Sequence, residues 1–367
     1  MKNLFIILIA ILSITASQAD GVARKVIFDT DMGTDDWFAL AYLVGNQDID
    51  LVGVTIVGNG LTPCPYAASN AKYILDLSMR HKNTPVGCGS SWPMDGYASY
   101  PLLWREGGIS MLGGRIPERN PMESYDDSTN LLSRLLSEAS GPIDIIAVGA
   151  LTNIASVIKS QPKLKKKVKR ITSMGGAVDV PGNLRVHGFT DQHPNTKAEW
   201  NFYIDPVAAQ IVLRSGIPLR LVPLDATNKV PLTASFVERI HSLPVSPIQS
   251  FVARTFDRVL SSTSNGEYYH WDPLAAVVAD NPSLCDRDDN RQLDVVTTLG
   301  QDYGLPNGQS KNFFPLSGYF GKKRKPLSSL AAGATVRTST AKNIKVCYHV
   351  EPAVYEMEFI KGISGSF

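Results

Sequence analysis

The sequence has no marked excess of charge of either sign, because 36 lysine and arginine residues nearly balance 34 aspartate and glutamate residues. Its two short basic runs, residues 163–170 and 322–325, lack the interleaved aromatic residues that stack on nucleic-acid bases. We therefore interpret both runs as solvated surface, and we expect no nucleic-acid partner.

Cysteines are few, and the spacing of Cys64, Cys88, Cys285 and Cys347 fits no zinc site. The chain also lacks an Asn-x-Ser/Thr acceptor with a permitted middle residue, so N-glycosylation is not expected. In an oxidising compartment one or two disulfides are expected. Cys64–Cys88 is the preferred pair, because both residues fall at loop ends near predicted strand ends, but the sequence leaves the pairing open.

Long apolar runs are absent except at the N-terminus, where residues 4–14 follow Lys2. Small residues at Ser17 and Ala19 suit a signal-peptidase cut after Ala19, which predicts a signal peptide over residues 1–19. The apolar run is too short to span a bilayer comfortably, and an uncleaved anchor is the alternative. We therefore expect a secreted or periplasmic protein without a stable membrane anchor.

No internal repeat and no convincing linker divides the rest of the chain, so we expect one domain over residues 20–367. Strand and helix patterns alternate, and apolar runs such as residues 51–57 are typical of parallel strands covered on both faces. The sequence predicts an α/β fold with a mostly parallel, Rossmann-type open central sheet flanked by helices. The long segment 89–127 is expected to be a binding loop or lid.

Residues 26–43 dominate the chemistry of the sequence. A short apolar strand runs directly into a cluster of aspartates that includes Asp31, Asp35 and Asp36, and carboxylates so close together raise each other's pKa. A hard divalent cation is the simplest way to offset this repulsion, and Gly33 lets acids from both sides of the bend converge. The alternative is a helix N-terminus stabilised by Asp35 and Asp36, which leaves Asp31 unexplained.

Polar groups follow other predicted strands as well. They are Asn59, the Val148-Gly149 backbone, the turn at residues 174–176, and Asp225, which a purely structural role explains equally well. Ligands bind beyond the carboxyl ends of strands in parallel sheets, so these groups are expected along one edge. A G-x-S-x-G elbow is absent, which disfavours a serine nucleophile.

Six segments in order resemble the calcium-dependent nucleoside hydrolase family, over most of the chain after the signal peptide. The first, DTDMGTDD at residues 29–36, is similar to the family's DTDPGxDD, with Met32 in place of proline. The others are TIVGN at residues 55–59, GALTN at 149–153, MGG at 174–176, AEWN at 198–201 and WDP at 271–273. The resemblance implies a nucleoside hydrolase-like fold and hydrolysis of an N-glycosidic bond.

The resemblance also implies a Ca²⁺ site held by Asp31, Asp36, Asp272 and the main-chain carbonyl of Val148. Calcium takes about six to eight oxygen ligands, which these groups, water and a sugar diol supply. Asp31 is implied as the general base that activates a metal-bound water, while the surrounding carboxylates stabilise the positive charge that develops on ribose.

Contacts to the ribose hydroxyls are implied for Asp35, Asn59, Asn183, Glu199 and Asn201. Asn183 lies in a polar insert, residues 182–197, which makes the distance to Glu199 longer than the family's usual spacing. Asn195 in the same insert is the alternative. Trp200 is interpreted as a packing residue on an extended segment, with its two neighbours pointing to the other side.

The segment around Trp271 resembles the purine-preferring inosine–adenosine–guanosine branch. There an indole stacks on the purine and favours its protonated, departing form through cation–π attraction. Trp104, or else Trp92, is expected to complete the stack, whereas a core role is the alternative for Trp271. We interpret His270 as a neighbour with a satisfied hydrogen bond rather than an acid. The implied substrates are inosine, adenosine and guanosine, and the implied assembly is a homodimer or homotetramer.

Other functions stay open on the sequence alone. A phosphatase could use Asp29-Thr30-Asp31, but Thr34 lies three rather than two residues after the second aspartate. A non-catalytic exported nucleoside- or sugar-binding protein would have little need for a carboxylate-bound metal. A non-specific nucleoside hydrolase is the alternative to purine preference, and turnover separates all of these possibilities.

Overall fold

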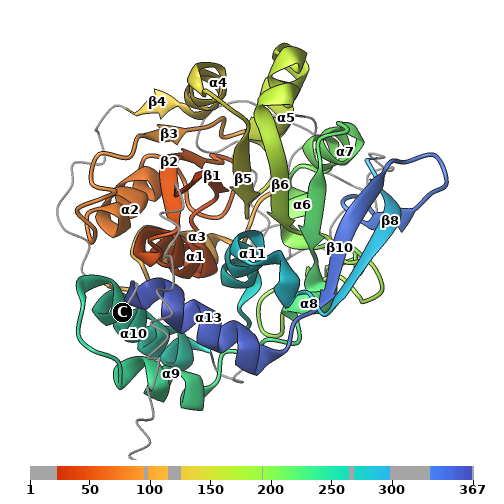
Figure 1. Ribbon diagram of the computed structural model, residues 1–367. Helices are drawn as coiled ribbons and strands as arrows, with labels where there is room; N and C mark the ends of the chain where they lie inside the picture. Colours follow the sequence, from red (N-terminus) through yellow and green to blue (C-terminus); the bar gives the residue numbers. More distant parts are fainter. Residues whose placement is uncertain are drawn as a thin grey trace, which may run out of the picture.

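The computed structural model describes residues 23–94, 98–114, 125–191, 193–263, 268–297 and 331–365. In these parts of the chain a ten-stranded sheet runs through the centre of the molecule, with helices on both faces (Figure 1). The predicted signal peptide lies outside the described residues. None of the described helices is both long and apolar enough to cross a membrane.

The sheet has the strand order β4-β3-β2-β1-β5-β6-β7-β10-β8-β9. Neighbours from β4 to β10 are parallel, and only the β10–β8 and β8–β9 pairs are antiparallel. This confirms the predicted mostly parallel α/β sheet. The strands are β1 (Arg24–Thr30), β2 (Ile49–Ile56), β3 (Val86–Cys88), β4 (Asp126–Asp127), β5 (Ile143–Ala147), β6 (Val168–Met174), β7 (Leu219–Val222), β8 (Arg287–Val295), β9 (Thr335–Arg337) and β10 (Asn343–His349).

The two faces of the sheet carry different sets of helices (Figure 1). On one face lie α1 (Thr34–Gly45), α2 (Tyr66–Leu75) and α11 (Trp271–Asp280), with α9 (Ala234–His241), α10 (Pro247–Ser262) and α13 (Pro352–Ser364) outside them. On the other lie α4 (Ser128–Glu138), α5 (Thr152–Ser160) and α7 (Pro206–Arg214). Short helical segments complete the fold: α3 (Leu102–Ile109), η1 (Pro162–Lys167), α6 (Trp200–Ile204), α8 (Leu224–Thr227) and η2 (Pro282–Leu284).

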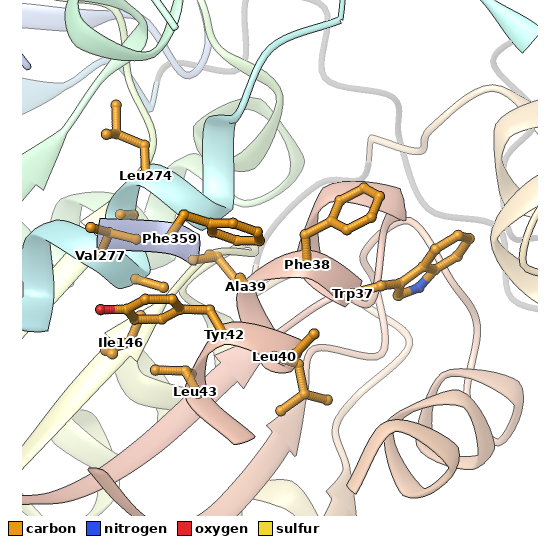
Figure 2. Close-up of a cluster of buried hydrophobic side chains, with 14 of the residues drawn as sticks. Trp37, Phe38, Ala39, Leu40, Tyr42, Leu43, Ile146, Leu274, Val277 and Phe359 are labelled. Atoms are coloured by element: carbon orange, nitrogen blue, oxygen red, sulfur yellow. The ribbon is translucent and has the colours of Figure 1, made fainter. Parts of the chain in front are cut away.

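Helix α1 is the centre of the larger core. Its residues are buried almost all round, because the sheet, α11 and α13 surround it. Figure 2 shows Phe38 and Tyr42 of α1 beside Phe359 of α13, with Leu274 and Val277 of α11 in the same cluster. A helix that is apolar on every side is expected to be buried in this way. Its packing fixes the direction in which the acids of its first turn point.

Strand β1 lies at the point where the strand order reverses, between β2 and β5. In open α/β sheets this position forms a crevice at the carboxyl ends of the strands, where ligands bind. The predicted acids leave β1 directly into this crevice. The sheet topology thus places the candidate site before any side chain is considered.

Two disulfides cross-link the chain. Cys64–Cys88, the preferred pair, joins the loop after β2 to the end of β3, with the two Cα atoms 6.0 Å apart. The sequence left the second pair open, and the structure contains Cys285–Cys347, with a Cα separation of 5.5 Å. The segment 89–127 was expected to be a loop or lid, but its described part also contains helix α3, so that description was incomplete.

Candidate active site

Asp31 leaves the carboxyl end of β1 and is held by backbone donors on two sides. Its Oδ1 accepts a hydrogen bond from the N–H of Gly33 at 3.3 Å, and its Oδ2 accepts one from the N–H of Leu61 at 3.1 Å. The loop that carries Leu61 can approach only because residue 60 is glycine: a Cβ on Gly60 would lie 2.0 Å from the Asp31 Cβ. The loop after β2 therefore fixes this carboxylate at the sheet edge.

Asp36 lies in the first turn of α1, and one of its oxygens is enclosed by the turn before it. Its Oδ1 accepts hydrogen bonds from the N–H groups of Asp31 at 3.1 Å and Met32 at 3.2 Å, and from the Thr30 hydroxyl. Met32 has a φ of 55°, which lets the chain wrap round this oxygen. The Asp36 carboxyl also lies within hydrogen-bond reach of the carboxyl groups of Asp31 and Asp272.

Asp272 reaches the same place from the first turn of α11, near the other end of the chain. One carboxylate oxygen each of Asp35, Asp36 and Asp272 lie within 4.8 Å of one another. Asp31 adjoins this trio through Asp36, whereas Asp35, which the resemblance assigns to ribose, is one of its members. Acids from both ends of the sequence thus converge on one point.

The donor chemistry of this cluster fits a hard divalent cation such as Ca²⁺. All its ligand atoms are oxygens, and the Oδ1 of Asp272 is buried without a hydrogen-bond partner among the described residues. Within the described ranges, no lysine, arginine or histidine forms an ion pair with any of these carboxylates. Buried carboxylates without a cation are costly, so the cluster is built for positive charge.

Burial raises the pKa of every carboxyl group in the cluster. It raises the pKa of Asp31 and of Asp35 from 3.8 to about 6. The pKa values of Asp36 and Asp272 lie well above the usual range, because burial and the charges of neighbouring acids act in the same direction. The sequence prediction that crowded carboxylates raise each other's pKa is confirmed, with burial as the larger cause.

Asn201 and Asn59 line the same edge of the sheet. The Nδ2 of Asn201 donates to the Val148 carbonyl oxygen, the predicted main-chain ligand, at 2.9 Å. The Nδ2 of Asn59 donates to the Thr152 hydroxyl at 3.0 Å. Both side chains are buried. Their hydrogen bonds to the turn after β5 orient them beside the acid cluster.

Glu199 is the N-cap of helix α6, which corrects the extended conformation expected for this segment. Its Oε1 accepts from the N–H of Asn201 at 2.7 Å, and its Oε2 accepts from those of Gly176 at 2.9 Å and Phe202 at 3.2 Å. Burial raises its pKa to about 7. Glutamate is not among the residues that usually cap helices, so no local signal marked the start of α6.

The two candidate asparagines of the insert differ in what their side chains already do. The Oδ1 of Asn195 accepts from the N–H groups of Lys197 and Ala198, and its Nδ2 donates to the Ala332 carbonyl. The Oδ1 of Asn183 accepts from the N–H of Trp200 at 3.2 Å. Asn195 is therefore committed to the structure of the insert, and Asn183 stays the better ribose candidate.

Trp271 and His270 begin α11 but belong to different surroundings. The half-buried Trp271 ring packs on those of Tyr268 and Tyr269, at centroid distances of 5.0 and 5.6 Å. His270 is fully buried, and neither ring nitrogen has a hydrogen-bond partner among the described residues, so the expected hydrogen bond was wrong. Burial lowers its pKa to about 3, which agrees with its not acting as an acid. The His270 ring lies in an aromatic box, formed by the rings of Phe236, Phe256, Tyr355 and Phe359.

Trp104 lies on α3 in a second ring cluster. Its centroid is 5.5 Å from that of Trp200 and 5.8 Å from that of Phe189, a residue of the insert. Trp200 is buried, and its Nε1 donates to the Asn183 carbonyl at 3.1 Å, which agrees with a packing role. The half-buried Trp92 precedes this helix in the same segment. No ring contact within the described residues joins this cluster to that of Trp271.

Two further residues have roles that the sequence did not resolve. Both Asp225 oxygens accept backbone N–H groups, those of Val178 and Asp179 at 2.8 Å, so its role is to hold the turn after β6. Tyr100 was not predicted at all. Its hydroxyl donates to the Oδ1 of Asn201 at 3.0 Å, inside the candidate site. No local pattern marks Tyr100, because its contact depends on how α3 packs.

Comparison with known proteins places this geometry in context. The family model described as "Inosine-uridine preferring nucleoside hydrolase" matches residues 26–356. The chain is 33% identical over 227 residues to the uncharacterized protein C1683.06c of Schizosaccharomyces pombe, covering 61% of this chain and 69% of that protein. It is 31% identical over 237 residues to the pyrimidine-specific ribonucleoside hydrolase RihA of Salmonella schwarzengrund, covering 64% and 71%.

A solved structure agrees in fold. The purine-preferring ribonucleoside hydrolase from Gardnerella vaginalis superposes with a TM-score of 0.70 at 23% identity, covering 93% of this chain and 98% of that one. This similarity shows the fold alone. The two named hydrolases carry opposite base preferences in their descriptions.

Proposed function

The chain belongs to the inosine-uridine preferring nucleoside hydrolase family, which cleaves the N-glycosidic bond of ribonucleosides, and from this premise we propose that it is a Ca²⁺-dependent hydrolase of purine ribonucleosides. Its products are the free base and ribose. The observation that carries the proposal is the meeting of Asp35, Asp36 and Asp272 at the carboxyl end of β1. Proteins that only capture a sugar have no need of such a cluster.

The proposed Ca²⁺ ligands are Asp31, Asp36, Asp272 and the Val148 carbonyl, with Asp35 close enough to join them. When bound, Ca²⁺ would anchor the ribose diol and lower the proton affinity of a coordinated water. The carboxylates themselves favour the positive charge that develops on the sugar as the bond breaks.

Asp31 is the proposed general base. Its carboxylate takes a proton from a water molecule while the water oxygen bonds to the anomeric carbon of ribose. The carbon–nitrogen bond breaks and its electron pair leaves with the base, which takes a proton from solvent, while Asp31 returns its own proton to solvent before the next turnover. The bonds from Gly33 and Leu61 keep the carboxylate in one orientation for this step. The ribose hydroxyls are proposed to contact Asp35, Asn59, Asn183, Glu199 and Asn201.

Trp271 is the proposed purine contact, and Trp104 the proposed second ring of the stack. The Trp271 ring packs on that of Tyr268, whose pKa is raised by burial and by the charges of Asp35 and Asp272, so the indole lies near the acid cluster. Its buried Nε1 has no partner within the described residues. An indole favours a cationic, protonated purine over the neutral base, which makes the purine a better leaving group. A purine also offers more ring surface than a pyrimidine.

Export is proposed from the predicted signal peptide over residues 1–19, with cleavage after Ala19. The bridges Cys64–Cys88 and Cys285–Cys347 support it, because disulfides persist mainly in oxidising compartments. A homodimer or homotetramer stays a prediction.

The deciding experiment is to incubate the mature protein with inosine and with uridine, with and without a chelator. We expect hypoxanthine from inosine in Ca²⁺, loss of that activity on chelation, and slower release of uracil. No turnover of either nucleoside would refute the enzymatic proposal. Turnover that persists after chelation would refute the metal requirement alone.

A second candidate is a pyrimidine-preferring or non-specific hydrolase. The 31% identity to the RihA protein of Salmonella schwarzengrund favours it, since that protein is described as pyrimidine-specific. The same assay separates the two, because uracil release as fast as hypoxanthine release would remove the purine preference.

A further inference from the structure

Tyr100 enters the candidate site from the segment before α3, and its hydroxyl meets the polar groups proposed for ribose. It donates to the Oδ1 of Asn201 at 3.0 Å and lies within hydrogen-bond reach of the Asp31 carboxyl. The side chain is only 6% exposed. The hydroxyl of Tyr100 thus lies between a residue proposed for ribose, Asn201, and the proposed general base, Asp31.

Of the two polar side-chain atoms of Asn201, only the Oδ1 is available to a substrate. Its Nδ2 is directed to the carbonyls of Val148 and Met174, at 2.9 and 3.4 Å. Its Oδ1 has Tyr100 as its one partner within the described chain. The Tyr100 hydroxyl takes one of the two lone-pair directions of this oxygen, so it occupies space and a hydrogen bond that a ribose hydroxyl could otherwise take.

The ring of Tyr100 belongs to the ring cluster that contains Trp104 and Trp200. It stacks on Trp200, with centroids 5.0 Å apart and planes 23° apart, and its centroid lies 6.5 Å from that of Trp104. Leu102 and Leu103, which follow Tyr100 and Pro101, are 48% and 66% exposed, so the start of α3 lies at the protein surface. Trp104 in turn contacts Phe189, which is 42% exposed, so Tyr100 is the inner end of a row of rings that reaches the surface.

We propose that Tyr100 is a specificity-determining residue whose hydroxyl imitates a ribose hydroxyl and yields its place to the sugar of an incoming nucleoside. The inference rests on the proposed function, since it takes ribose as the competing group. A ligand then gains its bonds to Asn201 only by replacing those of Tyr100, so a sugar without the matching hydroxyl cannot displace it. The site discriminates against ligands that offer a base alone.

The test is Tyr100→Phe, which removes the hydroxyl and keeps the ring on Trp200. Calorimetric titration with ribose in Ca²⁺ should give about two- to tenfold tighter binding, the range expected for one neutral hydrogen bond. The KM for inosine should fall by a similar factor. Weaker ribose binding would mean that the hydroxyl contacts the sugar directly, and unchanged binding would mean that it does not compete. Either result overturns the proposal.

The matched control is Tyr203→Phe in the same ring cluster. The Tyr203 hydroxyl lies 3.3 Å from the Nε2 of His193, a residue that is not proposed to contact ribose, so its loss should leave ribose affinity unchanged. Wild-type turnover of inosine tests the proposed function separately. If the wild type is active and ribose binding to Tyr100→Phe does not tighten, only this inference fails.

A second measurement covers the case in which Tyr100→Phe does not fold. 3-Fluorotyrosine placed at residue 100 reports the ring's surroundings through its ¹⁹F resonance. Saturating ribose should shift that resonance, because the ring leaves the face of Trp200. A resonance that ribose does not move would overturn the proposal.

Discussion

The two ends of helix α11 handle buried charge in opposite ways. At its first turn, Asp272 meets Asp35 and Asp36 with no ion pair to a basic side chain in the described chain. At its last turn, the side chains of Arg24 and Arg170 donate to the Ala279 carbonyl at 2.7 and 3.3 Å. The helix dipole favours both arrangements, an acid at the start and cations at the end.

The difference lies in how the charges are balanced. At the far end Asp144 faces Arg24 at 3.6 Å and Arg170 at 3.9 Å, and Asp280 faces Arg24 at 3.2 Å. These acids have basic partners within the protein, whereas the acids around Asp272 form no ion pair with any basic residue of the described ranges. One helix therefore joins a balanced end, at the amino-terminal edge of the strands, to an unbalanced end at their carboxyl edge. Only the unbalanced end has a use for an external cation.

The largest expected effect is that of Asp31→Asn on turnover. It removes the proposed base but leaves the Leu61 N–H an oxygen to bond, so kcat for inosine should fall about 10³-fold while the protein stays folded. Steady-state kinetics and circular dichroism measure the two quantities. Asp144→Asn, at the balanced end, is the matched control and should keep kcat. A fully active Asp31→Asn protein would contradict the assignment of the base.

The second-largest expected effect is that of Ca²⁺ and pH on the stability of the fold. Burial raises the folded-state pKa of Asp31 and Asp35 to about 6, above the ordinary 3.8, so the folded metal-free protein binds more protons than the unfolded chain between about pH 4 and 6. The contribution of Asp31 and Asp35 to the stability of the metal-free fold therefore falls as the pH rises from about 4 to 6, and it is lowest above about pH 6. Ca²⁺ prefers the ionised form, so the stability that it adds should grow from pH 5 to pH 8.

The measurement is thermal unfolding with Ca²⁺ or chelator at pH 5, 6, 7 and 8. At a Ca²⁺ concentration about 100 times the dissociation constant, the gain should be about 2.7 kcal/mol. The difference between the two curves isolates the cluster, because acids elsewhere contribute to both. A gain that shrinks as the pH rises would contradict an ionised cluster as the binding site. Asp272→Asn should flatten the dependence.

The part of the unbalanced end that follows parallel strands could be predicted from the sequence. The carboxyl ends of such strands gather at one sheet edge, so Asp31, Asp36 and Asn59 could be expected together from the strand pattern alone. That Asp272 joins them came from family resemblance, since no local rule brings residues so far apart into contact. The structure brings its carboxylate to those of Asp35 and Asp36.

The details that the sequence missed depend on packing. Tyr100 meets Asn201 only because α3 lies against the insert, and His270 has an aromatic box rather than a hydrogen bond because α9, α10 and α13 close round it. The start of α6 is a different case, since Glu199 caps this helix although glutamate is not a residue type that usually marks a helix N-terminus. Tertiary contacts account for the first two, and local chemistry for the third.

A smaller effect is expected at the balanced end, from Asp144→Asn on stability. The side chains of Arg24 and Arg170 are 23% and 27% exposed, so water offsets part of the loss when their acid is removed. We expect the free energy of unfolding to fall by about 1–2 kcal/mol, below the figure for a fully buried pair. Urea unfolding measures it. A loss of Ca²⁺ affinity in this variant would show that the two ends of α11 are not independent.

The smallest effect concerns Trp271, which stands beside the unbalanced end without carrying charge. Trp271→Leu keeps an apolar side chain against Tyr268 and Tyr269 but removes the indole face. A cation–π contact contributes about 0.5–2 kcal/mol, so kcat/KM for inosine should fall about tenfold, and for uridine less than threefold. The ratio of the two kcat/KM values is the measurement, and Trp104→Leu tests the other proposed ring in the same way. If Trp271→Leu slows hydrolysis of both nucleosides equally, the indole serves to pack the start of α11 and the purine preference must come from elsewhere.

If the ratio of kcat/KM for inosine to that for uridine falls as expected, the same helix turn supplies both the acid that holds the cation and the ring that selects the base.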